Sequence, residues 1–139
     1  MVFRQVESAE RFDRLWPILI AAVGKPGADR HEQLREQYLP PSHQLWELRD
    51  TTRAVGVIGV RVGDPAEITH IAVDPEYRGR GYGARLVARL CKKHPGITTW
   101  WAETDDDAVG FYRRLGFAVE RLPPKYPNVT RYRCTLSSL

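Results

Sequence analysis

The chain has 139 residues and a mass of 15.9 kDa, a length that fits one domain, because two separate cores would each be marginal. Hydrophobic residues make up 42% and charged residues 27%, which excludes a disordered or collagen-like chain and predicts a single soluble domain over residues 1–139. The formal charge is +4, and 17 arginines outnumber 4 lysines. Arginine suits phosphate and carboxylate groups, so the composition predicts an anionic partner, with a GC-rich genome as the alternative explanation.

The sequence disfavours membrane, secreted and metal-binding proteins. The longest apolar runs, such as Ile18–Val23, are far shorter than the roughly 20 residues that span a bilayer. The first residues do not combine a basic region with an apolar stretch, so we expect a cytoplasmic protein without a membrane partner. The two cysteines, Cys91 and Cys134, and the four histidines lack the spacing of a metal site, so no metal is expected.

Hydrophobic periodicity in the first half of the chain predicts one strand, two helices and three further strands. Apolar residues at three-and-four spacing between Phe12 and Val23 indicate a helix, with Ser8 as its N-cap. Asp29 followed by Glu32 fits a capping box at the start of a second helix, which ends before Pro40. In chain order, the predicted elements are strand 2–6, helices 9–23 and 29–39, and strands 44–49, 54–62 and 67–73.

The second half predicts two helices and three strands. In chain order, they are helix 83–94, strand 97–103, helix 107–115, and strands 117–121 and 132–136. Gly116 stands where a helix C-cap requires left-handed backbone. Trp100 and Trp101 are adjacent on a strand, so they point to opposite faces, and we expect each to pack against one layer of helices.

A glycine-rich turn between strand 67–73 and helix 83–94 carries most of the functional information. Gly79, Gly81 and Gly83 stand at alternate positions beside Arg78 and Arg80. The first amides of a helix have no intrahelical partner and lie at the positive end of its dipole, and glycines let an anion approach closely. The turn therefore predicts a phosphate-binding site.

A dinucleotide-binding fold is a competing interpretation of the same turn. Gly79, Gly81 and Ala84 satisfy the pattern G-x-G-x-x-A, and Glu103 stands about where a ribose-binding acid is expected. However, residues 74–78 separate the strand from the first glycine, and the rest of the chain lacks repeated strand–helix–strand units. We therefore disfavour this interpretation.

Two segments resemble a known family. The first is Arg78-Gly79-Arg80-Gly81-Tyr82-Gly83, preceded by Ile71-Ala72-Val73-Asp74-Pro75-Glu76-Tyr77, and the second, about 30 residues later, is Ala108-Val109-Gly110-Phe111-Tyr112-Arg113-Arg114-Leu115-Gly116-Phe117. Both resemble the recurrent segments of the GNAT superfamily of acyl-CoA-dependent N-acyltransferases. The close resemblance covers residues 67–121, whereas the first 60 residues match only in the order of elements. One departure is Asp105, where the family often has Asn.

The resemblance implies an α/β fold of the α+β type in one domain. A mixed, mostly antiparallel sheet of about seven strands would be flanked by about four helices, in the order β-α-α-β-β-β-α-β-α-β-β. The cosubstrate would be acetyl-CoA, with its pyrophosphate on the amides of residues 78–84, closest to Gly81 and Gly83. Its pantetheine arm would bond the backbone of residues 71–73. The implied cofactor-binding residues are Ile71, Ala72, Val73, Arg78, Gly79, Arg80, Gly81, Tyr82, Gly83, Ala84 and Phe111.

The resemblance also implies direct transfer of the acetyl group to a primary amine. Tyr112 occupies the family's position for the proton donor to the departing thiolate. A phenol has an ordinary pKa of about 10 and must be protonated to act, so we expect the rate to fall at high pH. Glu67 is our first candidate for the base, with His70, Glu103 or a water molecule left open. Strand alternation places Glu67 and Thr69 on one face and His70 on the other.

The amine acceptor is not identified by the sequence and is expected to be a small molecule, peptide or protein. In the family it is set by segments that correspond here to Gly24–Asp29 and Leu122–Val129. No nucleic-acid partner is expected, and a homodimer is compatible with the sequence. The alternative is a non-catalytic module that binds CoA, another anion or nucleic acid through the arginine-rich glycine turn.

Overall fold

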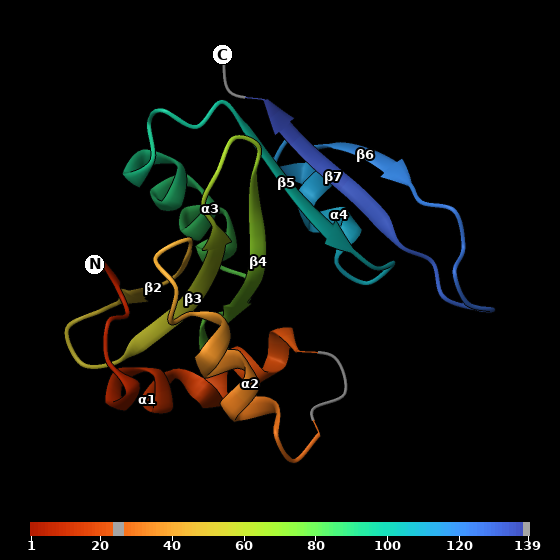
Figure 1. Ribbon diagram of the computed structural model, residues 1–139. Coiled ribbons are helices and arrows are strands. Elements are labelled where there is room, and N and C mark those ends of the chain that lie inside the picture. Colours follow the sequence, from red (N-terminus) through yellow and green to blue (C-terminus); the bar gives the residue numbers. More distant parts are fainter. Residues whose placement is uncertain (24–26, 138–139) are drawn as a thin grey trace.

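The computed structural model describes residues 1–23 and 27–137, which form one seven-stranded sheet with helices on both faces (Figure 1). The strands are β1 (Val2–Gln5), β2 (His43–Arg49), β3 (Ala54–Arg61), β4 (Ala66–Val73), β5 (Thr99–Thr104), β6 (Ala118–Arg121) and β7 (Tyr132–Ser137). The helices are α1 (Ala9–Leu19), α2 (Arg30–Gln37), α3 (Tyr82–Lys93) and α4 (Val109–Arg114), with short 3-10 helices η1 (Ile20–Ala22) and η2 (Pro75–Tyr77). The predicted order of strands and helices is confirmed, and element bounds differ from the predictions by a few residues.

The sheet has the order β1-β2-β3-β4-β5-β7-β6, and every neighbouring pair is antiparallel except β4 and β5. The mixed, mostly antiparallel sheet is therefore confirmed. The parallel pair is short, because only Ala66 with Trp100 and Glu67 with Trp101 are in register. Beyond these residues β4 and β5 diverge toward their C-terminal ends, as Figure 1 shows. This divergence opens the sheet at its centre.

Two hydrophobic clusters cover the two faces of the sheet. One joins Phe12, Leu15 and Leu34 of α1 and α2 to the inner strands, and the other joins Leu86 and Leu90 of α3 and residues of α4 to the opposite face. The larger cluster also holds Trp100, which is 1% exposed.

The expectation that Trp101 packs on a helix layer is wrong. Trp101 belongs to neither hydrophobic cluster of the described residues. The guanidinium of Arg133, from β7, lies 4.2 Å from its ring centroid. This contact replaces a helix as the cover of the ring.

The helix caps follow the sequence prediction at α1 but not at α2. The Ser8 hydroxyl accepts a hydrogen bond from the Arg11 amide, as expected for an N-cap. Asp29 precedes α2 but its side chain makes no capping bond, and Glu32 pairs with Arg35 instead. The predicted capping box is therefore wrong, because the available arginine takes the carboxylate that would have bonded the backbone. Among the described residues, no helix is both long and apolar enough to cross a membrane.

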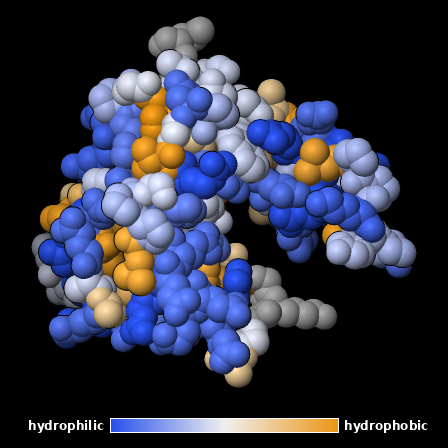
Figure 2. Space-filling view, viewed as in Figure 1, coloured by the Kyte–Doolittle hydropathy of each residue, from blue (hydrophilic) through white to orange (hydrophobic). Residues whose placement is uncertain are grey.

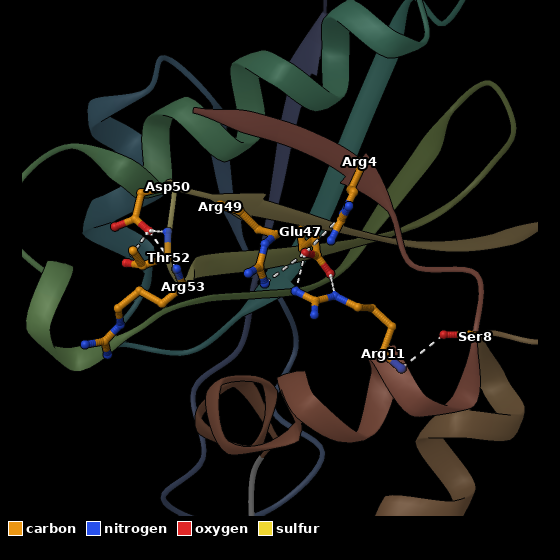
Figure 3. Close-up of polar contacts among 8 residues, drawn as sticks. All are labelled: Arg4, Ser8, Arg11, Glu47, Arg49, Asp50, Thr52 and Arg53. Carbon is orange, nitrogen blue, oxygen red and sulfur yellow. Dashed lines mark hydrogen bonds and ion pairs between the residues drawn. The ribbon is translucent and has the colours of Figure 1, made fainter.

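A buried carboxylate fastens α1 to the edge of the sheet (Figure 3). Glu47 of β2 is completely buried, and Arg11 of α1 donates to both of its oxygens, at 2.7 and 2.6 Å. Arg4 and Arg49 approach the same carboxylate at 3.4 Å each. The bidentate pair therefore joins α1 to β2 through two short charge-assisted hydrogen bonds.

Candidate active site

The divergence of β4 and β5 forms a cleft of about 830 Å³. Figure 2 shows it as a recess between the region of β5, β6 and β7 and the region of α1 and α2, with a largely hydrophilic rim. Most of the predicted site residues line it: His70, Ile71, Ala72, Val73, Arg78, Gly79, Gly81, Tyr82, Gly83, Ala84, Glu103, Phe111 and Tyr112. Arg80 and Glu67 do not line it.

The glycine-rich turn presents unpaired backbone amides at one end of the cleft. Gly79 and Gly81 have φ of 77° and 83°, which favour glycine, and both positions face open space. Gly81 is the N-cap of α3, and the first intrahelical bond runs from the Arg85 amide to its carbonyl. The amides of residues 82–84 precede that bond. With the helix dipole, they form the anion-binding geometry that the sequence predicts.

Gly83 has a second reason to be glycine. A Cβ on this helical residue would lie 2.7 Å from the Phe111 ring of α4. The absence of a side chain therefore lets Phe111 pack against the first turn of α3. Both residues line the cleft, so this contact joins the phosphate-binding turn to the helix that carries Tyr112.

Polar contacts hold the turn against the β2–β3 hairpin. The Tyr77 hydroxyl donates to Asp50 at 2.6 Å, and Arg53 pairs with Asp74 at 3.1 Å. The Tyr77 bond, with bonds from the Thr52 and Arg53 amides, lowers the pKa of Asp50 to about 2. Asp50 is thus a carboxylate at neutral pH and keeps its four donors, the fourth being the Thr52 hydroxyl.

The two predicted arginines differ in their relation to the cleft. Arg78 is exposed and lines the cleft, and its Nε donates to the carbonyl of Val73 at 3.2 Å. The guanidinium of Arg80 lies 5.8 Å from the Tyr77 ring centroid. Arg80 therefore contributes positive charge near the turn but does not line the cleft.

Tyr112 lies deeper in the cleft, on α4. It is 4% exposed, with the rings of Phe111 and Phe117 edge-on at 5.1 and 5.2 Å. Burial, with a smaller contribution from Cys134, raises its pKa to about 12. The Tyr112 hydroxyl has no hydrogen-bond partner among the described residues. Every fully buried side-chain polar atom of these residues does have a partner, so the Tyr112 hydroxyl is not fully buried. The hydroxyl therefore reaches the cleft.

Asp105, the departure from the family pattern, shapes the loop before α4. Its carboxylate accepts hydrogen bonds from the amides of Asp107 and Ala108, at 3.0 and 3.1 Å. An Asn side chain could accept the same two hydrogen bonds, so the conformation of this loop is compatible with either Asp or Asn at position 105. Asp105 also lines the cleft, where it adds a negative charge.

The three predicted bases differ in their access to the cleft. Glu67 is held by Arg61 at 3.1 Å and lies outside the cleft wall. Glu103 lines the cleft and lies 3.6 Å from Arg131. His70 lines the cleft and is partly buried. Of the three, His70 combines access to the cleft with freedom from an ion pair.

The predicted faces of β4 are corrected at one point. Strand alternation places Thr69 and His70 on opposite faces, but a register shift in the pairing with β3, between Gly59 and Val60, interrupts it. Both side chains consequently reach one hydroxyl, that of Tyr38, at 2.6 and 2.5 Å.

His70 makes the stability of the fold depend on pH. Burial, assisted by the charge of Arg30, lowers its pKa from 6.5 to about 4. Between these values the unfolded chain binds a proton that the folded chain does not, so stability falls as the pH falls from about 6.5 to about 4. We expect a loss of about 2 kcal/mol between pH 7.5 and pH 5. Urea unfolding of wild type and His70→Gln at both pH values checks this, and an equal loss in both proteins would contradict it.

Sequence reasoning missed three residues of this region: Tyr38, which contacts two wall residues, and Arg30 and Arg131, which line the cleft. All three come from segments outside the recognised motifs. One sequence feature could have indicated the contact of Tyr38: Gly59 lies within a strand, where a glycine often marks the close approach of another group. Here it faces the Tyr38 ring.

Described residues beside or within the predicted acceptor segments line the cleft or a neighbouring pocket. Residues 24–26 of the segment Gly24–Asp29 fall outside the described residues, and the flanking Val23 and Arg30 line the cleft. The loop between β6 and β7 forms a smaller pocket of about 250 Å³, which shares Glu103 and Arg131 with the cleft.

Comparison with known proteins agrees with this architecture. A family model for the Acetyltransferase (GNAT) family matches residues 10–117. The peptidyl-lysine N-acetyltransferase YjaB of Salmonella typhimurium is 33% identical over 88 residues, which cover 63% of this chain and 59% of that protein. The N-alpha-acetyltransferase RimI of Mycobacterium tuberculosis is 31% identical over 137 residues, covering 82% of this chain and 87% of that protein.

A solved structure has the same fold. An aminoglycoside 6'-N-acetyltransferase complexed with coenzyme A superimposes with a TM-score of 0.84 over 99% of this chain and 97% of that one, at 19% identity. The fold and cleft are those of a GNAT-type protein. The chain belongs to the GNAT acetyltransferase family. The matched part spans less than two thirds of YjaB, the first of these relatives.

Proposed function

We propose that this protein transfers the acetyl group of acetyl-CoA to a primary amine. The observation that carries the proposal is that the amide-lined turn before α3 and the hydroxyl of Tyr112 lie in one cleft. The turn suits a phosphate group, and the cleft continues from it to a proton donor. Family membership and the coenzyme A in the similar solved structure support the same activity.

The residues present fit acetyl-CoA. Any other residue type at position 79 or 81 would place a side chain in the open space beside the turn. The amides of residues 82–84 are available to a pyrophosphate. Residues 68–73 of β4 have no β5 partner in register among the described residues. Apart from the Val73 carbonyl, which accepts a bond from Arg78, the backbone on this side of β4 is therefore available to bond a pantetheine arm as an added strand. Phe111 would pack beside the arm near the turn.

The cleft residues can handle the protons of the transfer. When bound, acetyl-CoA supplies an acetyl thioester as the acyl donor. Tyr112 would donate its hydroxyl proton to the departing thiolate, and a base would take the proton of the amine. We place His70 first as this base because it lines the cleft, whereas the role of Glu67 stays a prediction.

The acceptor remains open within the class of primary amines. The names of the relatives include a peptidyl-lysine and an N-alpha-acetyltransferase, and that of the solved structure an aminoglycoside acetyltransferase, so similar proteins differ in acceptor. Small molecules, peptides and proteins are therefore all included in the test. A cytoplasmic location and a homodimer remain predictions from the sequence.

Titration calorimetry with acetyl-CoA, followed by an amine panel monitored by release of the CoA thiol, tests the function. Micromolar acetyl-CoA binding and thiol release with an amine are expected. Binding without release from any amine would favour a CoA-binding module. Tight RNA binding that survives about 0.2 M salt, without CoA affinity, would favour a nucleic-acid module and overturn the proposal.

Gly81→Ala is expected to weaken acetyl-CoA binding about tenfold. A Cβ at a φ of 83° drives the turn away from its left-handed geometry, and restoring that geometry for the ligand costs about 1 kcal/mol or more. Calorimetry measures the change. Gly96→Ala is the matched control, because Gly96 follows α3 at its other end, in open space and without a positive φ. Equal affinity of both variants would remove the turn from the binding site.

A further inference from the structure

One phenol connects α2 to the wall of the cleft. Tyr38 follows α2 directly, and its hydroxyl lies 2.6 Å from Thr69 Oγ1 and 2.5 Å from His70 Nδ1. Both partners line the cleft, whereas Tyr38 does not. Any influence of Tyr38 on the chemistry must therefore pass through these two side chains.

The strands are shaped around this phenol. The register of β3 and β4 pairs Gly59 with His70 and Val60 with Ile68, which leaves Thr69 as an extra residue in a β-bulge. The bulge turns two consecutive side chains toward the same hydroxyl. A Cβ at Gly59 would overlap the end of the Tyr38 ring, so the strand gives up a side chain where the phenol lies.

The hydrogen bonds of Tyr38 restrict the tautomer of His70. The hydroxyl has one proton and two close partners, so its oxygen must accept in one contact and donate in the other. Either His70 donates from Nδ1 and Tyr38 donates to Thr69, or Thr69 donates to Tyr38 and Tyr38 donates to His70. The first arrangement leaves a lone pair on Nε2, and the second leaves an N–H there.

The charge of Arg30 favours the first arrangement. Arg30 lies at the start of α2, lines the same cleft and acts electrostatically on His70. The positive guanidinium of Arg30 interacts more favourably with a lone pair on His70 Nε2 than with an N–H at that nitrogen. Arg30 and Tyr38 lie at the two ends of α2, so this helix carries both groups that act on His70.

We propose that Tyr38 is a positioning residue that accepts the Nδ1 proton of His70, donates to Thr69 and thereby holds Nε2 unprotonated toward the cleft to receive the proton of the amine. This inference rests on the proposed acetyl transfer. As the amine nitrogen bonds to the acetyl carbon and the carbon–sulfur bond breaks, His70 takes the amine proton and Tyr112 protonates the thiolate. His70 then releases its proton to water and Tyr112 regains one, which leaves an amide and the CoA thiol. The acidic residues Glu103 and Asp105 line the same cleft as His70.

The first test reads the tautomer of His70 directly. In the full chain labelled with ¹⁵N-histidine, we expect a pyrrole-type nitrogen at Nδ1 and a pyridine-type nitrogen at Nε2 at pH 7. Thr69→Val removes the acceptor of the Tyr38 proton, which then turns to His70 Nδ1. The Nε2–H tautomer should therefore dominate in this variant, although Tyr38 and His70 are both intact. A purely structural hydrogen bond would not predict this reversal.

The second test measures turnover. Tyr38→Phe keeps the ring over Gly59 but loses the hydroxyl, and kcat should fall about tenfold, since general acid–base catalysis as a whole contributes about a hundredfold or more and only its geometry is lost. Acetyl-CoA affinity should not change. Tyr132→Phe is the matched control, because it removes the bond to Asp106 without contact to His70, and should leave both kcat and the tautomer unchanged.

Two results would overturn the inference: an Nε2–H tautomer in the wild-type protein, or wild-type kcat in Tyr38→Phe. The tautomer measurement needs no acetyl transfer, so it decides the geometry even if no amine reacts. Absence of acetyl-CoA binding in the wild-type protein would reject the proposed function. An active wild-type enzyme whose kcat is unchanged by Tyr38→Phe would reject this inference alone.

Discussion

Tyr112→Phe is expected to lower kcat about a hundredfold, equivalent to about 3 kcal/mol of barrier, while acetyl-CoA affinity stays unchanged. The substitution removes one hydroxyl that has no partner among the described residues. The ring keeps its edge-on contacts with Phe111 and Phe117, so packing is preserved. The loss should therefore appear in the chemical step, as measured by kcat with chemistry shown to be rate-limiting.

The pH profile sharpens this prediction. Because burial raises the pKa of Tyr112 to about 12, the phenol keeps its proton across the range in which the enzyme can be assayed. The fall in rate that an ordinary phenol would cause near about pH 10 should thus be absent below about pH 11. Tyr132→Phe again serves as the control for loss of a hydroxyl elsewhere. Wild-type kcat in Tyr112→Phe would make this residue a packing residue only.

The order of the elements could be predicted because local signals specify it. Glycines and prolines punctuate the chain at nearly every element end, and the apolar spacing of α1 and α3 is helical. The backbone geometry of the glycine-rich turn could also be predicted, since its glycines, their alternate spacing and the following helix are contiguous. Gly79 and Gly81 do adopt the left-handed backbone for which glycine is suited.

The arrangement around His70 could not be predicted from local sequence. Alternation along β4 is broken by a bulge in its pairing with β3, and the phenol that both bulge side chains contact, Tyr38, is 32 residues from His70 in the chain. At the start of α2 the failure has a local cause: a capping pattern was present, but Glu32 bonds to Arg35, three residues later in the same helix. Only the contact of Tyr38 with His70 depends on how α2 lies on the sheet.

The placement of α1 depends on the buried Glu47, which leads to the largest stability effect we expect (Figure 3). Arg11→Met keeps most of the side-chain volume but removes both short bonds to the carboxylate. Arg4 and Arg49, at 3.4 Å, compensate the charge in part only. Leaving a buried carboxylate without its main partner should cost about 3 kcal/mol of unfolding free energy.

A double variant separates the cost of the unpaired charge from the loss of side-chain packing. Arg11→Met with Glu47→Met removes both charges at similar volume. The two remaining arginines, Arg4 and Arg49, have side chains that are already 53% and 21% exposed, so their charges can turn to solvent. Replacing a buried ion pair by apolar side chains is often nearly neutral, so the double variant should recover to within about 1 kcal/mol of wild type. Urea unfolding followed by tryptophan fluorescence measures all three proteins. If the double variant were as unstable as Arg11→Met, packing of the arginine stem against the sheet, rather than the unpaired charge of Glu47, would be what holds α1 in place.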